Sequence, residues 1–141
     1  MQTITIQRIE TPPEDVVTYP DFLLCLLLQS GVGKIEPDWE SSGRKQVDWV
    51  FTSRISGGQK TLASCPVSCL RSIFARFAIV VNIRPYCGHV LFKVRFGEDE
   101  EPSNESFSLF LCNEPTMEIW MKLYFYGIDN KWPFDFETKP A

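Results

Sequence analysis

The sequence predicts an α+β fold, in which two helices pack on an antiparallel sheet of about five strands with a C-terminal meander. Three observations support this. Apolar and polar residues alternate in three successive runs between Val90 and Tyr126. The segment from Phe22 to Leu28 is apolar on every side, and apolar residues recur at helical spacing from Val67 to Val81. Such periodicities give each element one face to bury.

The first strand is expected at Thr3 to Ile9, with Ile4 and Ile6 on one face, and it ends before Pro12-Pro13. A helix follows, because Thr18 suits its N-cap and Gly31 its C-terminal cap. Leucine dominates its apolar segment, which favours a helix over a central strand.

The segment from Gly31 to Lys45 is predicted to be an irregular connection, because it holds glycines, Pro37 and a pair of serines. A strand is expected at Gln46 to Ile55, and Ser56-Gly57-Gly58-Gln59 ends it. The second helix is predicted to begin after Ser64 as its cap. Its apolar stripe comprises Val67, Leu70, Ile73, Phe74, Phe77, Ala78 and Val81.

The meander is predicted from short connections between the alternating runs. The two connections consist of turn-forming and charged residues, and they span Gly97 to Asn104 and Asn113 to Pro115. Both are too short for a parallel crossover. The three strands must therefore be antiparallel.

The chain of 141 residues, 44% of them hydrophobic, is expected to form a single domain over residues 1–141. Its longest apolar run, Phe22 to Leu28, is too short to cross a bilayer, and its N-terminus lacks a signal-peptide pattern. Five cysteines do not resemble a secreted disulfide framework. A cytoplasmic protein with reduced thiols is the expectation.

The net charge of −4 is unevenly distributed along the chain. From Gly43 to Arg84 there are seven basic residues and one acid, whereas from Phe96 to Met121 there are seven acids and no base. This separation of basic and acidic segments either steers a charged partner or is neutralised where the two segments pack side by side.

Catalytic chemistry has few candidate groups. His89 is the single histidine, and an extended Cys87-Gly88-His89 would place a thiol and an imidazole on one face. No nucleophile signature accompanies them, so the sequence favours binding over catalysis. Cys65, Cys69, Cys87 and His89 could together supply a tetrahedral zinc site, but their spacing is not that of a zinc knuckle. We expect no metal and no other cofactor.

Two further binding chemistries receive weak support. Ser56 to Thr61 resembles a phosphate loop, but Gln59 stands where the second glycine belongs. The basic segment offers Trp49 and Phe51 as stacking surfaces for a nucleic acid, but their shared parity with Val47 indicates a core position. We therefore expect neither nucleic acid nor membrane as a partner.

The first meander hairpin resembles a known protein family. Val90 to Gly97, an acidic turn, and Glu105-Ser106-Phe107 leading to Cys112 and Pro115 are similar to a hairpin of bacterial polymorphic-toxin immunity proteins. The likeness covers residues 90–115, with one extra residue between Cys112 and Pro115. It implies a small cytosolic protein that binds and blocks a cognate toxin, without catalysis of its own.

The leading functional hypothesis is therefore a protein-binding inhibitor of the immunity type. Its expected recognition residues are the acids of the hairpin: Glu98, Asp99, Glu100, Glu101 and Glu105. The alternative is a small-ligand or anion-binding domain, or a modest enzyme, with a pocket between sheet and helices. Its anion would be held by Arg71, Arg76 or Arg84.

Overall fold

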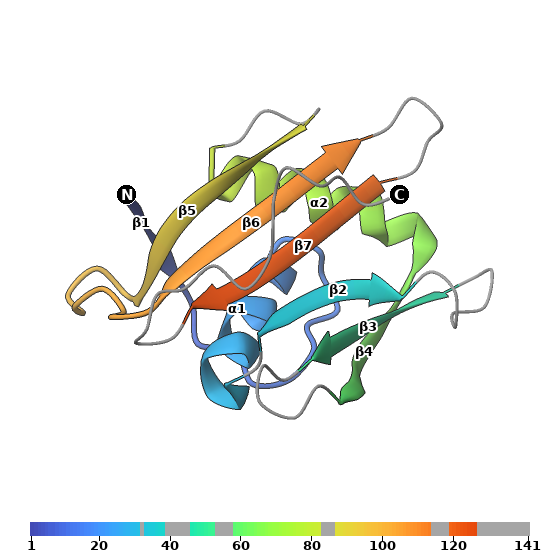
Figure 1. Ribbon diagram of the computed structural model, residues 1–141, viewed down its shortest axis with the longest axis horizontal. Coiled ribbons are helices and arrows are strands. Elements are labelled where there is room, and N and C mark those ends of the chain that lie inside the picture. The colour runs from blue at the N-terminus through green and yellow to red at the C-terminus, as the bar shows by residue number, and fades with distance from the viewer. Residues whose placement is uncertain (32, 39–45, 53–57, 83–86, 114–118, 127–141) are drawn as a thin grey trace.

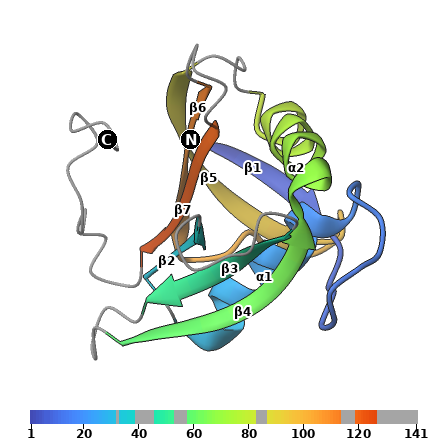
Figure 2. The ribbon, with the colours of Figure 1, turned by 90° about the vertical axis from the view of Figure 1, so that its right-hand side faces the viewer.

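The computed structural model describes residues 1–31, 33–38, 46–52, 58–82, 87–113 and 119–126. These residues form one mixed sheet of seven strands with two helices, α1 and α2, on one face (Figures 1 and 2). The strands are β1 (Gln2–Ile6), β2 (Lys34–Asp38), β3 (Gln46–Thr52), β4 (Gln59–Pro66), β5 (Cys87–Phe96), β6 (Ser106–Asn113) and β7 (Ile119–Tyr126). The helices are α1 (Tyr19–Ser30) and α2 (Val67–Val80). The α+β class is confirmed.

The strands lie in the order β1-β5-β6-β7-β2-β3-β4. The predicted meander is confirmed, because β5 pairs antiparallel with β6 and β6 with β7. A second meander, β2-β3-β4, joins it through antiparallel pairing of β2 with β7. β1 extends the other edge of the sheet by parallel pairing with β5.

The prediction of the sheet was wrong in the number of strands and in the direction of one strand pair. Seven strands form instead of five, and the β1–β5 pair makes the sheet mixed. β2 lies within the segment that the sequence predicts to be an irregular connection. Pro37 does not prevent this strand, because proline is tolerated at a strand position that needs no N–H donor. β4 was missed because the register shifts between Trp49 and Val50, which interrupts the alternation that marks a strand.

The new strand β4 also corrects two local predictions. Gln59, Lys60 and Thr61 are strand residues and not the end of a phosphate loop, while residues 53–57 lie outside the described part. Ser64 is likewise in the strand, and the N-cap of α2 is Pro66, with extended dihedral angles. α1 begins and ends as predicted, with Gly31 in the left-handed conformation at φ 64°. However, the Thr18 hydroxyl donates to Asp15 and does not cap the helix.

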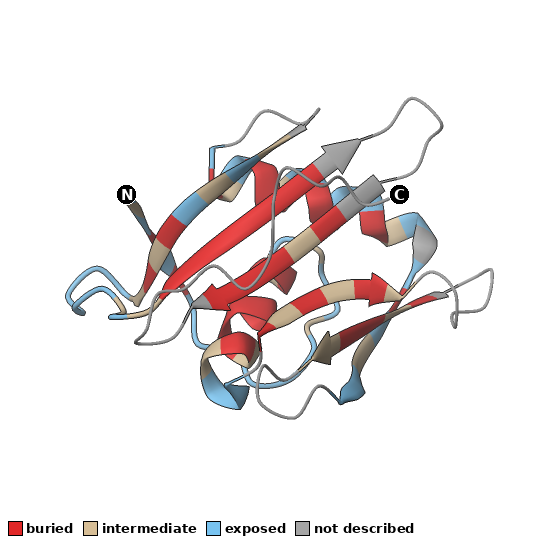
Figure 3. Cartoon of the chain, in the orientation of Figure 1, coloured by how far each residue is buried: buried red, intermediate tan, exposed pale blue. Residues whose placement is uncertain are grey.

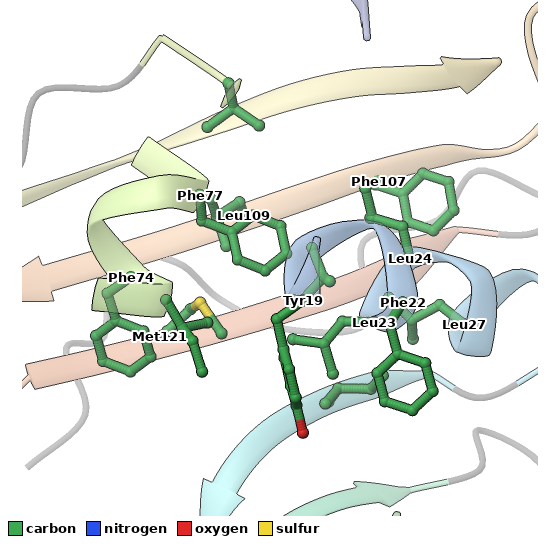
Figure 4. Packing of buried hydrophobic residues seen from close by; sticks show 14 of the residues in the cluster. Tyr19, Phe22, Leu23, Leu24, Leu27, Phe74, Phe77, Phe107, Leu109 and Met121 are labelled. Carbon is green, nitrogen blue, oxygen red and sulfur yellow. The ribbon is translucent and has the colours of Figure 1, made fainter. Parts of the chain in front are cut away.

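The core lies between the sheet and the two helices. The described members of the α2 stripe are buried, from Leu70 to Val81, whereas Ser68, Arg71, Ser72 and Ala75 are exposed on the opposite side. Figure 4 shows Phe74 and Phe77 of α2 in one cluster with Leu109 and Met121 of the meander. The predicted inward face of α2 is confirmed.

Trp49 of β3 is fully buried at the junction between the helices. Its ring lies 6.2 Å from that of Tyr19 in α1 and 6.3 Å, edge to face, from that of Phe74 in α2. Its indole Nε1 donates a hydrogen bond of 3.1 Å to the Cys65 thiol of β4. A stacking surface for nucleic acid is thus excluded at Trp49, because its ring is inaccessible.

Truncating the α2 stripe should be costly. Phe77→Ala removes a fully buried ring, and we expect the free energy of unfolding to fall by ~3–5 kcal/mol. Ser72→Ala, on the exposed side of the same helix, should change it by less than ~0.5 kcal/mol. Urea unfolding followed by circular dichroism measures both. If both substitutions lowered the free energy of unfolding by similar small amounts, the Phe77 side of α2 would not be the side that packs on the core.

Removing the Tyr19 hydroxyl should stabilise the fold. This oxygen is buried without a hydrogen-bond partner among the described residues, which carries a desolvation cost. We expect Tyr19→Phe to raise the free energy of unfolding by about 1 kcal/mol, since the ring contacts remain. Tyr124→Phe is the control, because the hydroxyl of this second buried tyrosine is not an unpaired buried group. A loss of stability in Tyr19→Phe would mean that its hydroxyl has a partner in solution.

Candidate partner-binding surface

The acidic residues predicted to bind a partner lie in the connection between β5 and β6. Glu98, Asp99, Glu100 and Glu101 are exposed, and Glu105 is half-buried at the start of the returning strand. Figure 3 shows this connection as an exposed projection from one end of the sheet. Within the described residues, none of the five carboxylates takes part in an ion pair. They are therefore available to an external cation. We refer to residues 97–105 as the acidic loop.

The backbone of the acidic loop is held at both ends. Gly97 begins it at φ 87°, in the left-handed region that favours glycine, and accepts a hydrogen bond of 3.4 Å from the Glu100 N–H. Near the other end, the Ser103 N–H donates a bond of 2.7 Å to the Val94 carbonyl of β5. The four exposed acids lie between these two attachments.

Ser103 is the residue that fixes the loop to the sheet. Its hydroxyl accepts a hydrogen bond of 3.2 Å from the Val94 N–H and donates one of 2.8 Å to the Glu105 carbonyl. This role of Ser103 is not apparent from the sequence. A serine between Pro102 and Asn104 indicates a turn, but its bond to Val94, nine residues away, follows only from the loop conformation.

Cations lie beside the strand that leads into the loop. The Arg8 guanidinium lies 4.0 Å from the centre of the Phe96 ring, a cation–π contact, and Arg95 Nε donates to the Thr5 hydroxyl at 2.9 Å. Parallel pairing of β1 with β5 places Ile6 opposite Phe96 and so positions Arg8. These contacts fix the strand ends without engaging the carboxylates.

The two charged segments of the chain do not neutralise each other in the described part. The basic segment supplies β3, β4 and α2, whereas the acidic loop joins β5 and β6. In the sheet, β7 and β2 stand between β6 and β3. Of the seven bases, Arg44, Lys45, Arg54 and Arg84 lie outside the described residues. Within the described residues, the Glu36 carboxylate forms ion pairs with Lys34 at 3.2 Å and with Lys122 at 3.7 Å.

The arginines of the alternative anion site are placed differently from one another. Arg71 is exposed and Arg76 is half-buried, whereas Arg84 lies outside the described residues. A separation of five positions puts Arg71 and Arg76 on different sides of α2. Burial raises the pKa of Asp21, while the Gln7 N–H, which donates to its carboxylate at 2.7 Å, and the charge of Arg76 act in the opposite direction. Within the described residues Arg76 forms no ion pair with Asp21, and its Nε is buried without a hydrogen-bond partner.

The described candidate zinc ligands, Cys65, Cys69 and His89, do not form one cluster. Cys65 is buried in the core, Cys69 is half-buried in α2, and His89 is exposed on β5. The side chain of Cys87 lies outside the described set. Among the side chains that are described, no cluster of three or more histidine, cysteine or acidic residues could hold a metal ion. Cys25, Cys65 and Cys69 are free thiols.

Comparison with known proteins gave no match, either to a protein-family model or to a curated protein. No helix within the described ranges is both long enough and apolar enough to span a membrane.

Stability should decline at alkaline pH. Burial raises the pKa of the Cys25 and Cys65 thiols above 9.0 and that of the Tyr19 and Tyr124 hydroxyls above 10.0. The native state therefore retains these protons at a pH where the unfolded chain loses them. The stability that these protonated groups contribute is fully present below their unfolded-state pKa. It is lost as the pH rises through their native-state pKa.

Urea unfolding at several pH values between about 8 and 10.5 tests this dependence. We expect a falling free energy of unfolding that begins near the ordinary thiol pKa of 9.0. Cys25→Ala should make the fall shallower, because one of the raised thiols is gone. A flat profile across this range would contradict the assignment of these groups as buried and neutral.

Proposed function

We propose that this protein is a non-catalytic inhibitor of the immunity type, which binds and blocks a cognate toxin through the acidic loop. The observation that carries the proposal is a run of four exposed acids, without ion pairs in the described part, on a loop held at both ends. Its partner surface would be rich in lysine and arginine, because charge complementarity supports rapid and selective association.

The like charges of the loop support a role outside folding. Four consecutive carboxylates repel one another in a short connection, which disfavours the folded chain slightly. Their side chains contribute no ion pair to the described fold that would offset this repulsion. A partner that supplies cations would offset it on binding.

The attachment of the loop supports binding in a fixed arrangement. Two hydrogen bonds between Ser103 and Val94 hold the turn against β5 before any partner arrives, and a third, to the Glu105 carbonyl, braces the loop internally. Ordering a loop in advance lowers the entropy lost on association. We therefore assign two separable contributions: the carboxylates set the rate of association, and Ser103 preserves the arrangement of the bound loop.

The charge contribution is tested by neutralising Glu98, Asp99, Glu100 and Glu101 to glutamine or asparagine. The fold should remain, with equal or slightly higher stability, and the association rate with the partner should fall at least about tenfold at low salt. Association of the native protein should also slow steeply with added salt, because exposed charges are screened over roughly 10 Å at 0.1 M. Glu10→Gln with Glu14→Gln is the control, since both acids are exposed in a different connection.

The partner is first isolated by a pull-down from the source organism with the native and neutralised proteins side by side. It is then expressed in a bacterial host with or without this protein. Growth arrest by the partner, relieved by the native protein and less by the neutralised one, is the expected result. Equal recovery of the same proteins by both baits would refute the role of the loop, and recovery of a small metabolite alone would favour the ligand-binding alternative.

The attachment is tested by Ser103→Ala, which keeps every charge and removes two side-chain hydrogen bonds. Dissociation from the partner should become faster, while the salt dependence of association stays that of the native protein. Surface plasmon resonance at several salt concentrations separates the two rates. An unchanged dissociation rate would show that the loop is not bound in its attached conformation.

A further inference from the structure

Arg8 lies at the point where the chain enters the acidic loop. Its guanidinium carbon is 4.0 Å from the centre of the Phe96 ring, and Phe96 is the last residue of β5, directly before Gly97. Arg8 is exposed, and it takes part in no ion pair with the residues that the structure describes. A cation over an aromatic face within about 6 Å is attracted to the ring, so this contact restrains both side chains.

The position of Arg8 is set by its neighbours in the chain. β1 ends at Ile6, which pairs with Phe96, and Arg8 follows two residues later. The Gln7 N–H donates a hydrogen bond of 2.7 Å to the Asp21 carboxylate of α1. The parallel pairing and this bond together hold the backbone on the N-terminal side of Arg8.

The backbone on the C-terminal side of Arg8 is held by Cys25 of α1. The Ile9 N–H donates a hydrogen bond of 3.3 Å to the Cys25 sulfur, and the Cys25 thiol donates one of 3.4 Å to the Gln7 carbonyl. Cys25 is buried, so water does not compete for these contacts. Residues 7 and 9 are therefore both fixed to α1, and Arg8 between them is kept beside Phe96.

The entering end of the acidic loop is otherwise weakly restrained in the described part. Gly97 adopts φ 87°, and glycine has wide backbone freedom. Its carbonyl accepts the Glu100 N–H at 3.4 Å, which is longer than the usual ~2.9–3.0 Å of such bonds. At the returning end, by contrast, Ser103 is bound to Val94 at 2.7 and 3.2 Å. The Arg8 contact thus restrains the end that Ser103 does not.

We propose that Arg8 is a positioning residue for the acidic loop: its guanidinium holds the Phe96 ring and so fixes the direction in which Glu98 and Asp99 leave β5. This role rests on the proposed inhibitor function, because a fixed loop serves a partner that binds it. A restrained entrance lowers the entropy that the loop loses on binding. Because Arg8 acts through the ring, the role requires a cation at this position.

Limited proteolysis of the full-length protein tests the role without a partner. Glutamyl endopeptidase cleaves after Glu98 and Glu100 of the loop, and cleavage of a folded protein follows the population of its locally open form. We expect Arg8→Ala to be cleaved at these two sites at least about threefold faster than the native protein. Arg8→Lys should stay close to the native rate, because it keeps a cation for the ring, whereas Arg8→Gln should behave like Arg8→Ala.

Two controls separate a local effect from a general one. Lys60→Ala removes a positive charge from an exposed position of β4, at the opposite edge of the sheet from β1, and should leave loop cleavage unchanged. Cleavage after Glu36, inside β2, requires the sheet to open and should be the same in all variants. Mass spectrometry of the fragments follows each site separately.

Native loop cleavage in Arg8→Ala, or cleavage that rises equally after Glu36, would overturn the positioning role and leave the inhibitor proposal unaffected. Fast loop cleavage in Arg8→Lys would overturn it too, since the cation–π contact would then not be the cause. Faster loop cleavage in Arg8→Ala and Arg8→Gln, together with a pull-down that recovers no partner, would support the positioning of the loop and refute the inhibitor function alone.

Discussion

The packing around Trp49 is the interaction on which the rest of the structure depends. In the described part of the chain, two helices of 12 and 14 residues cover the apolar face of the seven-stranded sheet. Trp49 contacts one aromatic side chain from each helix and bonds to the adjacent strand. It is the largest fully buried side chain among the described residues, and it joins both helices to the β2-β3-β4 half of the sheet. Large aromatic groups contribute strongly to such junctions because they bury the most area.

The acidic loop depends on this core only through its attachments. Hydrogen bonds between Ser103 and Val94 hold it against β5, and its exposed acids pack against nothing in the described core. Charge in the loop can therefore change without altering buried packing. This separation is what a recognition surface requires, since partner choice can then vary while the fold is kept.

The elements that the sequence predicted correctly are those with an uninterrupted period. The stripe of α2 and the predicted inward parity of β5, β6 and β7 indicate these elements, because each gives a face to bury. The alternation does not predict that Ser108 and Phe110 of β6 and Tyr124 of β7, on the opposite face of the sheet, are buried as well. Gly31 marked the end of α1 because its left-handed conformation is a local property.

The missed elements depend on partners distant in sequence. β4 contains a register shift and many exposed residues, so no alternation is visible without its neighbour β3. The parallel pairing of β1 with β5 joins residues about ninety positions apart and leaves no local trace. The acids of the candidate site were found because charge is visible in sequence, whereas the Ser103 attachment arises only from the folded loop.

Amide hydrogen exchange of Trp49→Phe, compared with the native protein, tests whether the Trp49 ring holds both helices on the sheet. We expect exchange to accelerate in α1 and α2 together, because both helices pack on the same ring. The amides of Val94 and Ser103 should keep their native protection, because polar contacts hold the loop independently. Faster exchange confined to β3 and β4, or opening of the acidic loop together with the helices, would contradict it.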